Sequence, residues 1–231
     1  LFRLFSNNKY LILQLLKHNI ISIDQSVYED MISKYDSNGL RYCYYFYPEL
    51  ESFAGSESMK MVKQELLAFD PKALDNFEYK REEGGNHTNI CYLIRHDSID
   101  EFDVYINKTN YSLNSEVPLS IFETNSFLIE KKQTTLIEYA AFYGSIQIFQ
   151  YLRLKKVDLN PSLWIYSIHS KKPDLIHLLE TYDVDPPMHL KKKSKPSNPD
   201  FVRTFNEAIK CHHNDIAEYI ENTLLNNDQI N

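Results

Sequence analysis

The clearest pattern of apolar and polar positions in the chain lies between Thr134 and Asn160. Small and apolar residues around Ala140 and Ala141 mark one face of a short helix, and Gly144 ends it. Apolar residues then recur at helical spacing over 148–152. The segment therefore predicts two short helices joined by a tight turn. Because two helices of this length do not bury their own apolar faces, we expect further pairs of the same shape beside them.

Similar patterns occur elsewhere in the chain. The predicted copies of the helical pair lie near 90–106, 136–152, 163–179 and 204–220. In these copies Ser167 and Ala208 stand at the position of Ala140, where a small side chain lets neighbouring helices approach closely. A weaker copy opens the chain, with Lys9 to Leu16 as its second helix. The repeat is therefore expected to span the whole chain.

The repeated unit resembles an ankyrin repeat. The ankyrin pattern is echoed by Thr135, Ile137, Tyr139, Ala140, Ala141, Gly144, Ile148, Tyr151, Leu152, Asp158 and Asn160. The match is incomplete, since Leu136 replaces the usual proline and Glu138 and Ser145 replace two histidines. His213 keeps the second histidine in the last copy, and the resemblance implies that its ring forms hydrogen bonds between neighbouring copies. The copies are also spaced irregularly, whereas ankyrin arrays repeat about every 33 residues.

The whole chain is similar to a large family of divergent ankyrin proteins expanded in trichomonad protists, in which this region is called a domain of unknown function. Phrases such as TLIEYAAFYGSIQIF and AIKCHHNDIAEYI carry this resemblance. It implies an all-α, ankyrin-like solenoid of stacked helical repeats. It implies nothing about an activity.

Two regions are expected. Residues 1–81 are predicted to form an irregular N-terminal helical region with a degenerate ankyrin-like copy, and residues 88–231 the ankyrin-repeat region. The polar stretch from Glu78 to His87 contains two glycines and is the predicted boundary. The aromatic run from Arg41 to Phe53 is interpreted as a helix buried on several sides, with a protein-binding patch as the alternative.

Two insertions interrupt the repeat region. Residues 111–132 contain enough apolar side chains to pack down as an ordered lid. Residues 185–200 contain four prolines, and they are expected to form an exposed loop. The lysines of this loop are Lys191, Lys192, Lys193 and Lys195. A solvated loop is favoured there over a nuclear-import address or an anion-binding patch.

Composition and charge narrow the class of partner. The chain has 231 residues and a formal net charge of −7, which disfavours nucleic acids and anionic membranes as partners. No apolar stretch approaches the ~20 residues of a membrane span. Cys43, Cys91 and Cys211 have no paired spacing and indicate reduced thiols of an intracellular protein. We therefore expect a monomeric, cytoplasmic protein, with nuclear localisation through the basic loop as the alternative. Because the chain begins at Leu1, it is expected to be processed or partial.

The sequence contains none of the common catalytic signatures, such as a Gly-rich phosphate loop, HExxH or a paired cysteine motif. Cys211, His212 and His213 are adjacent, but paired zinc ligands usually have two to five residues between them. Consecutive residues also point to different sides of a helix. The sequence therefore predicts no catalytic residue, no cofactor and no metal. The alternative is a regulatory or targeting part of a larger enzyme, or an enzyme that uses this cluster.

The predicted function is a non-catalytic scaffold or adaptor that binds another protein through the concave surface of the array. The register gives the expected partner-binding residues as Lys131, Lys132, Thr134, Phe142, Tyr143, His169, Ser170, Lys210 and Cys211. The adjacent rings of Phe142 and Tyr143, bordered by lysines, suit a partner with apolar anchors and an acidic rim. An equally weighted alternative is that these side chains contact the 111–132 insertion.

Overall fold

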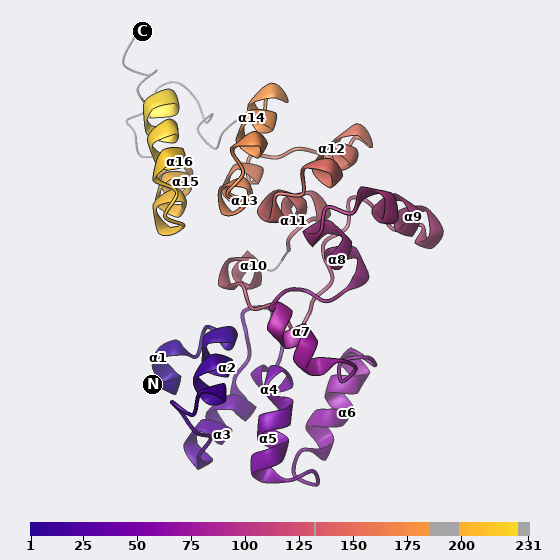
Figure 1. Ribbon diagram of the computed structural model, residues 1–231, viewed down its shortest axis with the longest axis vertical. Coiled ribbons are helices and arrows are strands. Elements are labelled where there is room, and N and C mark those ends of the chain that lie inside the picture. Colours follow the sequence, from indigo (N-terminus) through magenta and orange to yellow (C-terminus); the bar gives the residue numbers. More distant parts are fainter. Residues whose placement is uncertain (132, 185–198, 226–231) are drawn as a thin grey trace. The chain divides into compact units, whose positions relative to one another are not determined.

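The computed structural model describes residues 1–131, 133–184 and 199–225 of the chain, and its regular elements are helices (Figure 1). In these residues no β-strand forms, and only isolated bridges join Tyr35 to Arg41 and Glu116 to Thr135. The predicted all-α class is therefore confirmed. No helix of the described chain is long and apolar enough to cross a membrane. The basic loop predicted at 191–195 and Lys132 lie outside the described residues.

The chain forms two compact units. Unit 1 consists of Leu1–Thr88 and Pro118–Gln133, and unit 2 consists of Asn89–Val117 and Thr134–Asn231. The helices of unit 1 are α1 (Phe2–Phe5), α2 (Lys9–Lys17), α3 (Gln25–Ser33), α4 (Tyr42–Tyr45), α5 (Tyr47–Ala54), α6 (Lys60–Phe69), α7 (Phe77–Glu83) and α10 (Ser126–Lys131).

The aromatic run of unit 1 forms the centre of its core. It makes two short helices, α4 and α5, rather than one continuous helix. Tyr42, Tyr45 and Phe46 are at most 1% exposed. The rings of Tyr42 and Phe46 stack with their centroids 5.0 Å apart. The predicted burial is confirmed for the rings of residues 42–47, which pack inside the unit, whereas Phe53 at the end of the run is 43% exposed.

The polar stretch predicted as the boundary is partly helical and belongs to unit 1. Arg81 of α7 is almost fully buried, and its guanidinium donates two hydrogen bonds of 2.8 Å to the carboxylate of Glu49. A bidentate pair of this kind compensates the cost of burying the charge. His87 is also held, by contacts of 2.8 Å to Asp70 and Ser120. The boundary between the units therefore follows Thr88.

The 111–132 insertion is ordered, but most of it packs as part of unit 1. Ile121 and Phe122 are at most 1% exposed and join the core of that unit. The rings of Phe122 and Phe77 meet edge to face with centroids 5.1 Å apart. The expectation of a lid on the repeat region is therefore wrong for this part. Residues 111–117 remain in unit 2, where Val117 N donates to Thr134 O.

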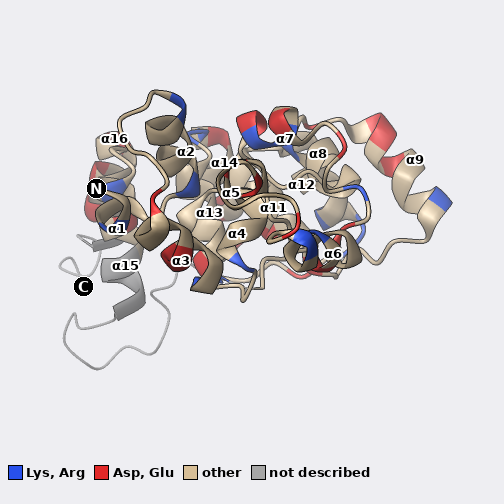
Figure 2. Ribbon diagram, turned by 90° about the horizontal axis from the view of Figure 1, so that it is seen from below, with Lys and Arg blue, Asp and Glu red and all other residues tan. Residues whose placement is uncertain are grey.

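Unit 2 contains helical pairs connected by tight turns. The first pair is α8 (Asn89–Arg95) and α9 (Ile99–Thr109), and the second is α11 (Leu136–Tyr143) and α12 (Ile146–Leu154). The third is α13 (Leu163–His169) and α14 (Pro173–Thr181), and the fourth is α15 (Pro199–Lys210) and α16 (Asn214–Tyr219), followed by a π-helical turn over Ile220–Leu225. The first turn of α9 contains acidic residues and its last turn contains Lys108 (Figure 2). This distribution of charge is favourable with respect to the helix dipole.

The turn inside each of the four pairs has the same backbone conformation. The residues that follow the first helices are in the left-handed region, with φ of +49° at Asp97, +70° at Gly144, +58° at Lys171 and +57° at His212. This common position aligns Leu93, Ala140, Ser167 and Ala208, which are all buried. The first pair is therefore displaced by one residue from the register that the sequence suggested, and Leu93 and Ile94 occupy the places of the two alanines.

Consecutive first helices contact each other in chain order. The contacts run from α8 to α11, from α11 to α13 and from α13 to α15, while α9 contacts α12 (Figure 1). At the centre Ala140 and Ala141 are fully buried. Thr135 begins α11 with a capping box, in which its side chain accepts from Glu138 N and Glu138 accepts from Thr135 N.

Candidate functional site

Side chains at the turns connect neighbouring pairs. The carboxylate of Asp97 accepts hydrogen bonds from Gln147 N at 3.1 Å and Ile148 N at 2.9 Å, and so caps the start of α12. The hydroxyl of Ser145 donates to Ile94 O. One pair further on, Lys172 Nζ donates to Gly144 O at 2.7 Å. These bonds hold the turns of the first three pairs next to each other.

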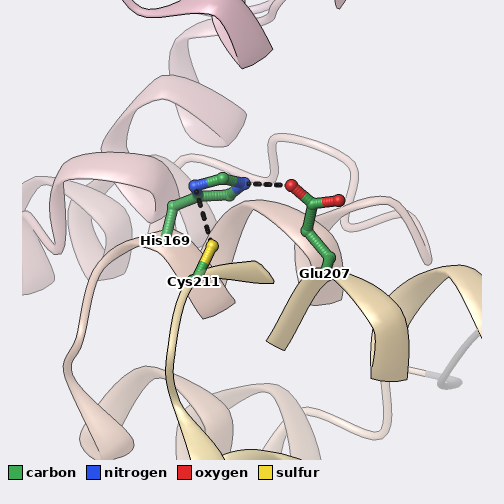
Figure 3. A group of neighbouring side chains, drawn as sticks. All are labelled: His169, Glu207 and Cys211. Atoms are coloured by element: carbon green, nitrogen blue, oxygen red, sulfur yellow. Dashed lines mark hydrogen bonds and ion pairs between the residues drawn. The ribbon is translucent and has the colours of Figure 1, made fainter. Parts of the chain in front are cut away.

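Three reactive side chains meet where the turn of the third pair lies next to the fourth pair (Figure 3). His169 ends α13, Glu207 lies on α15 and Cys211 follows α15. His169 Nδ1 lies 3.5 Å from Cys211 Sγ, and His169 Nε2 lies 3.2 Å from Glu207 Oε1. One donor atom of each residue lies within 4.8 Å of the others. We refer to these three residues as the turn cluster.

The surroundings of the turn cluster favour a protonated thiol. Burial is the largest cause that raises the pKa of Cys211, and the carboxylate of Glu207 raises it further. Lys210 and Lys171 act in the opposite direction. On one side the imidazole of His169 stacks on the ring of Phe142, with centroids 4.9 Å apart and an interplanar angle of 28°. The ring of His169 is thereby fixed in orientation.

Two kinds of chemistry are compatible with a cysteine, a histidine and a carboxylate in this order. A cysteine nucleophile needs a base within reach and a third group that orients the base, and the contacts of His169 supply both. However, a nucleophilic cysteine acts as the thiolate, which the raised pKa of Cys211 disfavours. A metal ion is the second option, because thiolate, imidazole and carboxylate are all zinc ligands.

Several of the sequence-predicted partner-binding residues lie at or near the turn cluster in unit 2. Tyr143, His169, Ser170 and Cys211 are half-buried and Lys210 is exposed. Ser170 donates from Oγ to Ser167 O at 2.7 Å. The exposed Lys171 was not among the predicted residues. We call Tyr143, His169, Ser170, Lys171, Lys210 and Cys211 the turn edge.

The remaining predicted partner-binding residues are placed differently. Phe142 is only 7% exposed and Thr134 only 4%. Thr134 Oγ1 lies 3.3 Å from the hydroxyl of the buried Tyr166. Thr134 and Phe142 therefore pack inside unit 2. Lys131 lies in unit 1, with its ammonium group 5.0 Å from the ring centroid of Phe127. Lys132 lies outside the described residues. The predicted set is therefore not one surface.

The ankyrin resemblance implied that the ring of His213 forms hydrogen bonds between neighbouring copies, but its Nε2 atom forms none within the described part of the chain. This nitrogen is buried and has no hydrogen-bond partner among the described residues. The backbone of His213 instead continues the turn, since its N–H donates to Ala208 O at 2.9 Å. The neighbouring His212 adopts a left-handed conformation and is exposed, whereas Nε2 of His213 is buried and Cys211 contacts His169.

A polar cavity of about 120 Å³ lies in unit 1. Lys34 Nζ on its wall donates to Ser6 O and Ser6 Oγ at 2.8 and 2.7 Å. The buried Lys9 Nζ donates to Asp36 at 2.8 Å. The ammonium groups of Lys9 and Lys34 at the cavity are thus both hydrogen-bonded to neighbouring groups, and this arrangement serves the stability of the unit.

Comparisons of this chain with protein-family models, with curated proteins and with solved structures find no match.

Proposed function

We propose that the chain is a non-catalytic interaction scaffold, built as an ankyrin-like helical repeat array in unit 2, that binds a partner protein along the turn edge. The observation that carries this proposal is the common left-handed residue in all four turns, together with the ordered contacts between first helices. Repeat arrays present such a row of equivalent positions as an extended binding surface. A monomeric state and a cytoplasmic location belong to the same proposal.

The hydrogen bonds between pairs support the array. Glu138, at the position of an ankyrin histidine, accepts a hydrogen bond from the hydroxyl of Ser162 in the connection to the third pair. The bond of Ser145 joins the first pair to the second, and the bonds of Glu138 and Lys172 join the second pair to the third. Nearest-neighbour contacts of this kind are what stabilises repeat proteins.

The turn edge supplies the binding surface of the proposal. It combines the half-buried ring of Tyr143 with the exposed ammonium groups of Lys171 and Lys210. A tyrosine beside positive charges suits a partner segment that has an apolar anchor and carboxylates around it. Phe142 supports the surface from below, since its ring lies between Tyr143 and His169. The lysines are expected to set the rate of association and the salt dependence.

The test is quantitative capture of proteins from the native cell extract on immobilised chain. The test variant carries Lys171→Glu and Lys210→Glu, which reverse the charge of the turn edge without touching buried residues. The control variant carries Lys108→Glu and Lys155→Glu, two exposed lysines of unit 2 outside that edge. We expect a partner that the wild type and the control retain and that the test variant loses at least about tenfold. Equal retention by the two variants would contradict binding at the turn edge.

A further inference from the structure

We propose that His169, Glu207 and Cys211 form a Zn²⁺ site that joins α13 to α15. The inference is independent of partner binding, because it rests on the turn cluster alone. The three side chains come from two different pairs, and they converge although the segment 185–198 separates the pairs in the chain. Figure 3 shows the imidazole of His169 between the sulfur of Cys211 and the carboxylate of Glu207.

The separations between the three side chains are close to those of a tetrahedral zinc ion. With Zn–S of about 2.3 Å and Zn–N and Zn–O of about 2.0 to 2.1 Å, tetrahedral angles place sulfur and nitrogen about 3.5 Å apart and nitrogen and oxygen about 3.3 Å apart. The observed separations are 3.5 Å between Cys211 Sγ and His169 Nδ1, and 3.2 Å between His169 Nε2 and Glu207 Oε1. The first distance is measured to Nδ1 and the second to Nε2, so only the second is already that of two ligands of one ion. Because one ligand atom of each of the three residues lies within 4.8 Å of the others, a small movement of the Cys211 side chain completes the set.

One nitrogen of the imidazole binds the ion. Nε2 is the nitrogen that faces the carboxylate of Glu207, so zinc takes the place of the proton between these two atoms. The thiol of Cys211 loses its proton and closes on the ion as the third ligand. The imidazole stays neutral because it carries one proton on Nδ1, so the net release to the solvent is one proton, and a water molecule completes the tetrahedron.

The mixture of donors selects the metal. A thiolate and an imidazole favour zinc and its neighbours in the first transition row over magnesium or calcium, which prefer oxygen ligands. The contact with Phe142 keeps the plane of the His169 imidazole fixed. A preorganised ring of this kind raises the affinity for a metal, since less side-chain freedom is lost on binding.

The consequence for the protein is a connection between the third and fourth pairs. In the metal-free protein the contacts of α15 with α13 include the buried Ala208 and Ile168. A bound ion adds coordinate bonds between the two pairs, and its binding free energy stabilises the folded arrangement. The last pair of the array is therefore expected to be held more firmly when zinc is present.

The test is titration of the full 231-residue chain, in reduced form, with Co²⁺ as the spectroscopic probe. We expect one equivalent to give the near-ultraviolet thiolate-to-cobalt absorption, and Zn²⁺ to displace it. Cys211→Ser removes this absorption. His169→Gln and Glu207→Gln weaken cobalt binding at least about tenfold, and the glutamine at 207 can still accept a hydrogen bond from His169.

The matched control is His212→Asn, because His212 is an exposed imidazole beside the cluster and asparagine tolerates its left-handed backbone. This variant should bind cobalt like the wild type. Helical circular dichroism of each variant separates loss of ligand from loss of fold. The proposal is overturned if the wild type gives no thiolate band, if the band persists in Cys211→Ser, or if His212→Asn binds as weakly as His169→Gln.

Discussion

The ring of Phe142 stacks on the imidazole of His169 at a centroid distance of 4.9 Å. Phe142 lies in the last turn of α11 and His169 ends α13, so the contact joins the second and third pairs at their turns. The sequence had suggested Phe142 as an exposed anchor for a partner. With 7% of its surface exposed, it acts instead as a packing residue beneath the turn edge.

Replacement of Phe142 by alanine should therefore destabilise unit 2. Removal of a buried phenylalanine ring costs about 3–5 kcal/mol of unfolding free energy, since it leaves a cavity. The measurement is urea unfolding followed by circular dichroism. Tyr143→Ala is the control, and it should cost clearly less because Tyr143 is only half-buried. A larger loss from Tyr143→Ala would show that the burial of the two rings is assigned the wrong way round.

Two buried serines of unit 2 should respond in opposite ways to alanine. Ser167 Oγ has no hydrogen-bond partner among the described residues, whereas Ser145 Oγ donates to Ile94 O. Because a buried hydroxyl without a partner is costly, Ser167→Ala should raise the unfolding free energy by about 1 kcal/mol. Ser145→Ala should lower it by about 1 kcal/mol, since the hydrogen bond to Ile94 O is lost while that oxygen keeps its bond from Asp97 N. Equal effects in the same denaturation assay would argue against this difference in hydrogen bonding.

Gly144 is required for two separable reasons. Its φ of +70° strains any residue with a Cβ atom, and a Cβ built there would lie 2.8 Å from Lys172 Cδ. Gly144→Ala should cost about 1–2 kcal/mol from the backbone alone. In the wild-type background a further loss of about 0.5–1 kcal/mol is expected, because Lys172 must leave Gly144 O. A double-mutant cycle with Lys172→Ala measures this coupling, and a coupling of zero would remove the second reason.

The hydroxyl of Tyr151 donates to Asp103 Oδ1 at 2.6 Å and links α12 to α9. Burial and this hydrogen bond raise the pKa of Tyr151 to about 12. Because the folded pKa lies above the ordinary value of about 10, the stabilisation is complete below pH ~10 and is lost as the pH rises towards 12. Ultraviolet difference titration of the wild type against Tyr151→Phe isolates this group. Asp103→Asn should lower its midpoint, and an unchanged midpoint would exclude Asp103 as a cause.

Much of the fold follows from local pattern. The helices around Ala140, Ser167 and Ala208 were predicted because apolar residues at helical spacing, small residues and turn residues agree over short stretches. The polar stretch from Glu78 to His87 was predicted as the boundary, and the units divide directly after it, at Thr88. Composition does not reveal that the stretch itself packs in unit 1, where the buried Arg81 pairs with the distant Glu49. The same limit applies to 118–133, whose apolar residues fit either a lid or a core.

The turn cluster was missed for a related reason. His169 and Cys211 stand in different pairs, and sequence spacing does not report contacts made when helices stack side by side. The adjacent His212 and His213 are the histidines that sequence spacing offers beside Cys211, but the structure places His169 there. The signal that was present is the alignment of the copies, since it places the ends of α13 and α15 at equivalent positions on neighbouring first helices.

The central claim is that the pairs of unit 2 follow one another in a row. Its most direct test is the distance between nitroxide labels, attached through a non-natural amino acid, at the exposed positions His96, Lys171 and His212 of the first, third and fourth turns. Packed helices are about 10 Å apart, so the separation from position 96 to 212 should exceed that from 96 to 171 by about 10 Å. A separation from 96 to 212 that is equal or shorter would contradict the array.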